Sequence, residues 1–107
     1  MGKKQPKKIT KSAALQKVVD ERFQRKGGGI LRREVWRNAS GQVVAYNLAY
    51  INTRLCGVDN GRILGYDNNH GHHHRHFRGA VEDVEFTSYE DIETRFQEEC
   101  YAIWQEE

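Results

Sequence analysis

The sequence predicts an α+β domain, in which a four-stranded antiparallel sheet is flanked by an N-terminal and a C-terminal helix. Apolar residues recur at helical spacing near both ends of the chain, whereas residues 30–51 alternate in the manner of strands. Clusters of Asn, Asp and Gly separate the strand-like segments and favour tight turns. The 107 residues fit one domain, which we place at residues 12–107 after a basic arm at residues 1–11.

The first expected element is a helix over residues 12–26. Three consecutive glycines at residues 27–29 end it, because glycine loses most freedom when held helical and tolerates left-handed backbone. Its apolar stripe at helical spacing consists of Leu15, Val18, Val19 and Phe23.

Residues 30–37 and 42–52 are expected to form a hairpin around a turn at residues 38–41. The first segment alternates between two faces, with Leu31 and Val35 on the same one. The second is rich in β-branched and aromatic residues on both faces, which is typical of a central strand.

Residues 62–66 and 72–77 are expected to be the third and fourth strands, joined by a turn at residues 67–71. Residues 81–86 follow as a short edge segment. A C-terminal helix over residues 89–105 closes the domain. Thr87 and Glu90 fit a capping box at its start, and its core-facing side chains are Ile92, Phe96, Cys100, Ile103 and Trp104.

All five histidines of the chain lie between His70 and His76. Histidine is the side chain that exchanges protons near neutral pH without a large pKa shift, so the cluster is the candidate site of chemistry. In the expected strand, alternate residues share a face. We therefore expect the strand to divide into a face of His72, His74 and His76 and a face of His73, Arg75 and Phe77, the second turned to the core.

General acid–base cleavage of RNA is the first chemistry that this cluster suggests. Two imidazoles on either side of a phosphate can take the proton of the 2′-hydroxyl and protonate the leaving 5′-oxygen, without a metal. Arg75 can stabilise the charge that develops at phosphorus. Tyr66 can stack a base or relay a proton, and Asp67 can orient a histidine.

Metal binding is the alternative chemistry. A His-x-His pair on a strand points two imidazoles in one direction, as in many zinc sites. His72, His74 and His76 then supply the ligands of a divalent metal, and the protein is a metal-dependent nuclease or phosphodiesterase. The flanking arginines repel a cation, so we expect no cofactor in the preferred interpretation.

The charge of the chain is distributed unevenly, with net values of +7 over residues 1–29, +4 over residues 30–80 and −9 over residues 81–107. Basic charge next to the histidines fits a polyanionic partner such as RNA. A second alternative is therefore a non-catalytic module that binds nucleic acid. The residues expected to contact nucleic acid are Lys3, Lys4, Lys7, Lys8, Arg54, Arg62 and Arg78.

Two cysteines, Cys56 and Cys100, are too few for a disulfide framework, and we expect both to be reduced in a cytoplasmic protein. No apolar run approaches the roughly 18–20 residues that a membrane helix needs, so no membrane contact is expected. The uncovered sheet face that the expected fold leaves would allow a homodimer.

Gly65–His76 resembles the core motif of the TumE-type toxin family of prokaryotic toxin–antitoxin systems, Gly-Tyr-Asp-Asn-x-His-Gly-x-His-His-Arg-His. A looser similarity runs from Ile30 to Trp104. The resemblance implies a toxin encoded beside a helix-turn-helix antitoxin, with an activity presumed to be ribonucleolytic. It also extends the non-catalytic alternative to a module that binds the antitoxin. The position that the family leaves variable is His72 here, so the resemblance places the catalytic candidates at His70, His73, His74, Arg75 and His76.

Overall fold

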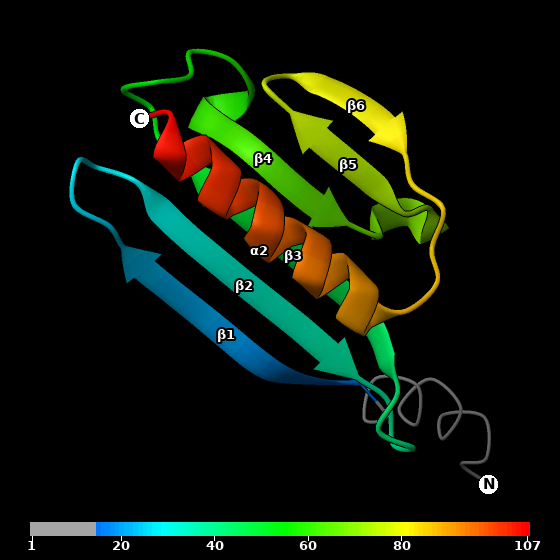
Figure 1. Ribbon diagram of the computed structural model, residues 1–107. Helices are drawn as coiled ribbons and strands as arrows, with labels where there is room; N and C mark the ends of the chain where they lie inside the picture. The colour runs from blue at the N-terminus through cyan, green and yellow to red at the C-terminus, as the bar shows by residue number, and fades with distance from the viewer. Residues whose placement is uncertain (1–14) are drawn as a thin grey trace, which may run out of the picture.

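A single antiparallel sheet of six strands forms one layer of the protein, and one helix lies across one face of it (Figure 1). The computed structural model describes residues 15–107. The strands follow one another across the sheet in chain order. They are β1 (Gln16–Gln24), β2 (Ile30–Arg37), β3 (Val43–Ile51), β4 (Arg62–Asp67), β5 (His74–Phe77) and β6 (Ala80–Asp83).

Two short 3-10 turns, η1 (Asp59–Gly61) and η2 (Asn69–Gly71), lie at either end of β4. The helix α2 (Tyr89–Gln105) follows β6 and has the bounds that the sequence predicts. Its cap is Ser88 rather than Thr87, since the Ser88 hydroxyl accepts a 3.0 Å hydrogen bond from the backbone N–H of Asp91. Within residues 15–107, no helix has both the length and the apolar character needed to cross a membrane.

The expected four-stranded sheet between two helices is wrong. The predicted N-terminal helix is the edge strand β1, and β6 adds a sixth strand at the other edge. In β1, Val19 lies opposite Val35 and Phe23 opposite Leu31, so alternate residues face α2. Glu21 lies between them and hides this alternation in the sequence.

Glu21 is compatible with that position because its carboxylate accepts a 2.9 Å hydrogen bond from Arg33 on β2. The consecutive Val18 and Val19 have helical spacing from Leu15 but, as β-branched residues, also suit a strand. The pairing with β2 decides between the two. The expected basic arm, with Lys3, Lys4, Lys7 and Lys8, lies outside the described residues.

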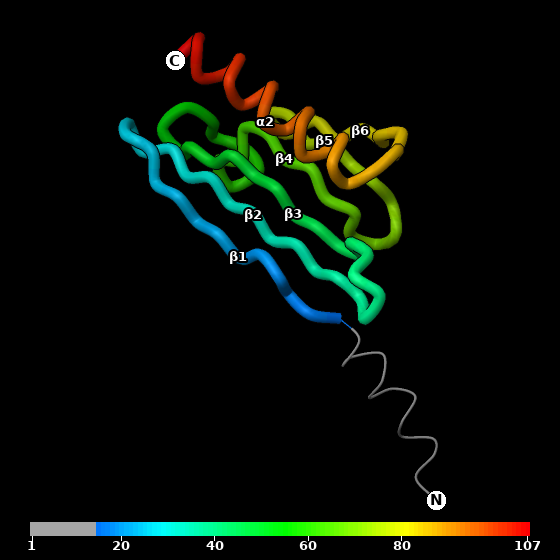
Figure 2. The backbone as a smooth tube through the Cα atoms, turned by 60° about the horizontal axis from the view of Figure 1, so that its bottom comes forward, coloured from blue at the N-terminus to red at the C-terminus, as the bar shows by residue number. Residues whose placement is uncertain are grey.

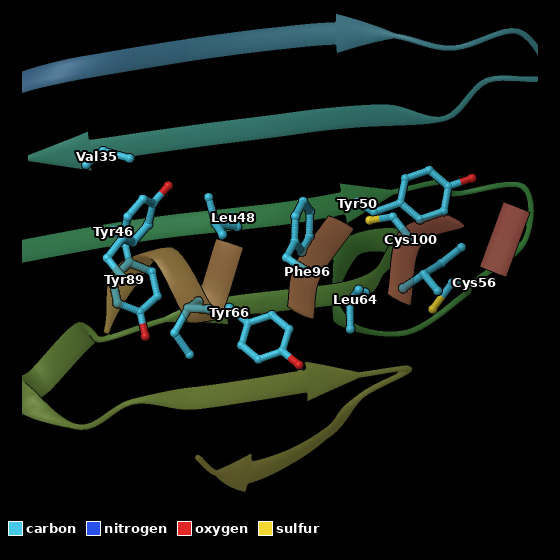
Figure 3. Packing of buried hydrophobic residues seen from close by; sticks show 12 residues of the cluster. Val35, Tyr46, Leu48, Tyr50, Cys56, Leu64, Tyr66, Tyr89, Phe96 and Cys100 are labelled. Carbon is cyan, nitrogen blue, oxygen red and sulfur yellow. The ribbon is translucent and has the colours of Figure 1, made fainter. Parts of the chain in front are cut away.

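The core fills the space between the sheet and α2 (Figure 3). From the helix, Ile92, Phe96 and Cys100 are buried, as the helical periodicity predicts. They pack against large side chains from one face of the central strands, namely Val35, Tyr46, Leu48, Tyr50, Leu64 and Tyr66. This burial determines which face of each strand is turned away from α2.

The opposite face of the sheet carries polar side chains and is not covered by any element of residues 15–107 (Figures 1 and 2). We call it the open face. One row of paired residues crosses it from β1 to β6 and consists of Asp20, Glu34, Asn47, Asp67, His74 and Asp83. Asp67 in this row is buried although it is a carboxylate. A buried charged group is more informative than exposed polar residues, which makes the open face the place to look for a site.

Candidate functional site

Strand pairing divides the predicted catalytic residues between the two faces of the sheet. On β4 and β5, Asp67 pairs with His74, and Gly65 pairs with His76. These positions belong to the open face. Tyr66 pairs with Arg75 on the face that α2 covers. The expected separation of His74 and His76 from Arg75 and Phe77 is thus confirmed, and Phe77 packs against the core.

Asp67, His76 and Arg62 form a continuous chain of hydrogen bonds on the open face. The Nε2 atom of His76 lies 2.9 Å from Oδ2 of Asp67, and its Nδ1 atom lies 3.0 Å from Nη2 of Arg62. Arginine has no acceptor, so it donates to Nδ1. The proton of a neutral His76 must therefore be on Nε2, where it is donated to Asp67. We call these three residues the Asp67–His76–Arg62 chain.

Asp67 is a buried carboxylate, with only 4% of its side chain exposed. Its other oxygen, Oδ1, accepts a 3.1 Å hydrogen bond from the backbone N–H of Asn69 in η2. A buried carboxylate is costly unless such partners compensate for its lost hydration. The turn that follows β4 and the imidazole of His76 both meet this need, and they hold the carboxylate in one orientation.

Arg62 reaches this chain by crossing over Gly65. A Cβ atom at residue 65 would lie 2.8 Å from Cδ of Arg62, so only glycine leaves the path free. The register between β3 and β4 shifts after Tyr50. Tyr50 pairs with Leu64, but the next residue, Ile51, pairs with Arg62. Ile63 is the extra residue and is fully buried. This bulge turns Arg62 to the open face, where its Nε donates to Asp59 at 2.8 Å.

His74 lies beside this chain and has uncommitted ring nitrogens. Its Nδ1 is 3.8 Å from Asp67 and its Nε2 is 3.7 Å from Asp83, which are ion-pair rather than hydrogen-bond distances. The rings of His74 and His76 are 6.2 Å apart between centroids. An imidazole in this position can exchange a proton with a bound ligand.

Arg75 and Tyr66 belong to a separate network on the covered face. The Tyr66 hydroxyl donates to Glu99 of α2 at 2.7 Å, and Nε of Arg75 donates to the same carboxylate oxygen at 3.2 Å. A second bond joins Arg75 to Glu82 at 3.0 Å. Burial and the Glu99 contact raise the pKa of Tyr66 to about 12. The network connects α2 with β4, β5 and β6.

His73 is also turned to the covered side. Its ring stacks on Phe86 with centroids 3.9 Å apart, and its Nδ1 lies 2.8 Å from the Tyr46 hydroxyl. Burial raises the pKa of Tyr46, so this hydroxyl stays protonated in its contact with His73. Burial, followed by the charge of His74, lowers the pKa of His73. These contacts hold the chain before β5 against β3.

The remaining predicted residues lie at the periphery. His70 is exposed in η2, where its φ is 63°, and His72 is exposed just after it. Arg54 donates to the carbonyl of Gly27 at 3.2 Å, and Arg78 lies exposed over the Phe77 ring. None of these contacts joins a peripheral residue to the Asp67–His76–Arg62 chain.

The proposed metal ligands do not converge. The ring centroids of His72, His74 and His76 are spaced 6.0 and 6.2 Å apart in series. Over residues 15–107, no group of three His, Cys, Asp or Glu side chains has the arrangement of a metal site. The alternative of a histidine-bound metal therefore has no preformed ligand set in the described part of the chain.

A groove of about 450 Å³ adjoins the Asp67–His76–Arg62 chain on the open face. We call it the β2–β3 groove, and sequence reasoning missed it. Strand pairing and the η1 turn bring its residues together from three distant segments. The spacing of these residues along the chain therefore does not predict a groove. Its lining includes Arg32, Glu34, Asn47, Ala49, Asn60 and Arg62.

Comparison with known proteins gives one match. No curated protein and no solved structure matches this chain. The family model described as Toxin TumE matches residues 7–103, which is nearly the whole chain and extends further towards the N-terminus than the motif similarity. The chain therefore belongs to the TumE toxin family, as the motif at Gly65–His76 suggests, and is the toxin of a toxin–antitoxin module with a cognate antitoxin as its partner.

Proposed function

We propose that this toxin is a metal-independent RNA endonuclease whose reaction takes place on the open face. The observation that carries the proposal is the Asp67–His76–Arg62 chain beside the uncommitted ring of His74. It combines an oriented imidazole, a second imidazole and a guanidinium within one solvent-accessible patch. These are the groups that cleavage through the 2′-hydroxyl requires.

A bound RNA phosphate competes with Nδ1 of His76 for the guanidinium of Arg62. When the guanidinium turns from Nδ1 of His76 to a bound phosphate, that nitrogen is released as a base, while Asp67 keeps the ring oriented through Nε2. His76 then takes the proton of the 2′-hydroxyl, and the 2′-oxygen forms a bond to phosphorus. The bond from phosphorus to the 5′-oxygen breaks, and protonated His74 supplies the proton to this leaving oxygen. Arg62 stabilises the negative charge on the phosphorane.

The products of this reaction are a 2′,3′-cyclic phosphate and a free 5′-hydroxyl. Incubation of the pure toxin with end-labelled RNA, with and without a strong chelator, tests the proposal. We expect cleavage in both samples and cyclic-phosphate ends. Activity that the chelator removes and one divalent ion restores would instead support a metal-dependent nuclease. Salt-sensitive binding of intact RNA would support a non-catalytic module.

Substitution of His74 by Ala should lower the cleavage rate by about 10²–10⁴, the range for loss of one general acid. It should not unfold the protein, because this ring makes no hydrogen bond within residues 15–107. His72→Ala is the matched control, since His72 is the exposed neighbour on the same side of the segment. Equal cleavage by the wild type and His74→Ala would exclude the proposed acid.

We further expect the antitoxin to be a helix-turn-helix protein encoded next to the toxin, and the pair to act in the cytoplasm. The adjacent reading frame and co-purification of its product with the toxin test this expectation. A homodimer through the open face would cover His74 and His76, so we expect any active dimer to form elsewhere. Light scattering of the active protein, combined with cross-linking, distinguishes these arrangements.

A further inference from the structure

The β2–β3 groove shares Arg62 with the Asp67–His76–Arg62 chain. Strand pairing places Ala49 next to Gly65 and Gly65 next to His76, in one row across β3, β4 and β5. Two strand spacings, about 10 Å, therefore separate the floor of the groove from the imidazole. One nucleotide spans such a distance between its phosphate and the far edge of its base.

The floor of this groove is low because its central side chain is small. Ala49 contributes only a methyl group, so a flat ligand can approach the sheet closely at this position. Arg32 and Arg62 line the groove, and each guanidinium is held by a carboxylate, Arg32 by Glu34 at 2.9 Å and Arg62 by Asp59 at 2.8 Å. The Arg32 guanidinium, held in this way, can stack on a nucleobase, while that of Arg62 is left for the phosphate.

One edge of the groove carries two acceptor oxygens, on Asn47 and Glu34. Nδ2 of Asn47 donates a hydrogen bond to Oε1 of Glu34 at 3.0 Å, which fixes which side of the amide carries the nitrogen. The other atom, Oδ1, accepts no hydrogen bond from residues 15–107. The hydrogen bond from Lys17, aided by that from Asn47, lowers the pKa of Glu34 and keeps the group ionised. A carboxylate oxygen with one donor retains a further lone pair. Asn47 Oδ1 and Glu34 Oε1 are thus neighbouring acceptors.

We infer that the β2–β3 groove is a nucleobase subsite that selects guanine in the nucleotide next to the cleaved phosphate. Guanine is the RNA base whose Watson–Crick edge presents two adjacent donors, N1–H and the 2-amino group. Adenine and cytosine present an acceptor next to their amino group, and uracil presents one imide donor between two carbonyls. The link between this subsite and cleavage rests on the proposed nuclease function, whereas binding of the base does not.

Titration of the full chain with the four 3′-nucleoside monophosphates, followed by NMR or calorimetry, tests the subsite without any cleavage. We expect guanosine 3′-monophosphate to bind about tenfold or more tightly than the other three, in line with the roughly 1–3 kcal/mol that paired hydrogen bonds to a base contribute. Inosine 3′-monophosphate, which lacks the 2-amino group, should bind more weakly than the guanosine compound. Equal binding of all nucleotides would overturn the inference.

Two variants locate the binding. Ala49→Leu fills the floor and should weaken guanosine 3′-monophosphate about tenfold to a hundredfold, the range for loss of a stacked base. Ala45→Leu is the matched control, because Ala45 lies on the same strand and face but outside the lining of the groove. Asn47→Ala removes one acceptor without adding volume and should reduce the preference for guanine over adenine. Wild-type binding by both Ala49→Leu and Asn47→Ala would also overturn the inference.

The cleavage pattern separates this inference from the proposed function. Cleavage after guanosine supports both. Selective binding of guanosine 3′-monophosphate with no cleavage of any RNA would refute the nuclease and leave the subsite intact. Cleavage after all four bases at equal rates would leave the nuclease intact and refute the subsite.

Discussion

The two faces of β5 use similar side chains for different purposes. On the open face, His76 is hydrogen bonded to Asp67 and Arg62, and His74 has uncommitted nitrogens. On the covered face, Arg75 is bonded to Glu99 and Glu82. One strand of four residues therefore carries both a candidate reaction centre and a structural connection to α2. On this strand, the partner of a polar side chain, rather than its type, decides what the side chain can do.

The largest effect that the comparison predicts is the loss of activity in His76→Ala. Removal of one general base typically lowers a rate by about 10²–10⁴, so cleavage of labelled RNA should fall by this amount. Asp67 keeps its hydrogen bond from Asn69, and circular dichroism should show a folded protein. A folded His76→Ala variant with wild-type cleavage would remove His76 from the proposed mechanism.

Arg75→Ala tests the covered face. In contrast to His76→Ala, it should lower the stability of the protein and leave the cleavage rate unchanged. It leaves Glu99 with the Tyr66 hydroxyl as its partner and removes a contact between β5 and α2. Because this network is partly buried, we expect the free energy of unfolding to fall by about 1–3 kcal/mol. Urea denaturation measures this loss. Below the unfolding transition, the cleavage rate should stay at the wild-type value, and a fall by a hundredfold would return Arg75 to the reaction centre.

Gly65→Ala should disturb only the open face. The new methyl group would meet Cδ of Arg62 at 2.8 Å, and this flexible side chain must move away from His76. We expect a roughly tenfold fall in cleavage rate, equal to about 1.4 kcal/mol in the barrier, with little change in stability. Gly57→Ala is the control, since a Cβ there meets nothing within 4 Å. Identical kinetics of the two variants would contradict the role assigned to Arg62.

The smallest predicted effect is a pH dependence of stability that comes from His73. Burial lowers the pKa of His73 in the folded protein below its unfolded value near 6.5. As pH falls through the unfolded pKa towards the folded one, the unfolded chain takes up the proton first, so stability decreases. Thermal denaturation at pH 7.5 and pH 5 should show a larger fall for the wild type than for His73→Phe. Equal falls would show that His73 is not the group responsible.

The periodicity of the sequence predicted much of this arrangement. It located α2, the β2–β3 hairpin and the side of β5 on which His74 and His76 lie. It failed at β1, where Glu21 interrupts an apolar alternation that only the Arg33 pair on β2 makes compatible with a strand. Local spacing contains no information about a partner that arrives from another strand.

The sequence named the candidate residues of the site but not which of them lie together on one face of the sheet. The motif placed Tyr66, His73 and Arg75 together with Asp67, His74 and His76. Strand pairing puts Tyr66 and Arg75 on the covered face, and His73 lies on that side through its contacts with Tyr46 and Phe86. Arg62 was expected to contact nucleic acid, and its bond to His76 depends on the bulge at Ile63 and on the open path over Gly65. Such irregularities leave no periodic signal.

The family, the C-terminal helix and the residues of β5 that share a face can all be predicted from the sequence, because all three depend on a local motif or a local period. Which imidazole is oriented, which remains free and where the β2–β3 groove lies depend instead on how the strands are arranged in space. The physical reason is that hydrogen bonding and desolvation depend on atoms within a few ångströms. For His76 these atoms belong to residues 9 and 14 positions away, and for Arg75 to a helix 24 positions away. The folding of the sheet brings them together.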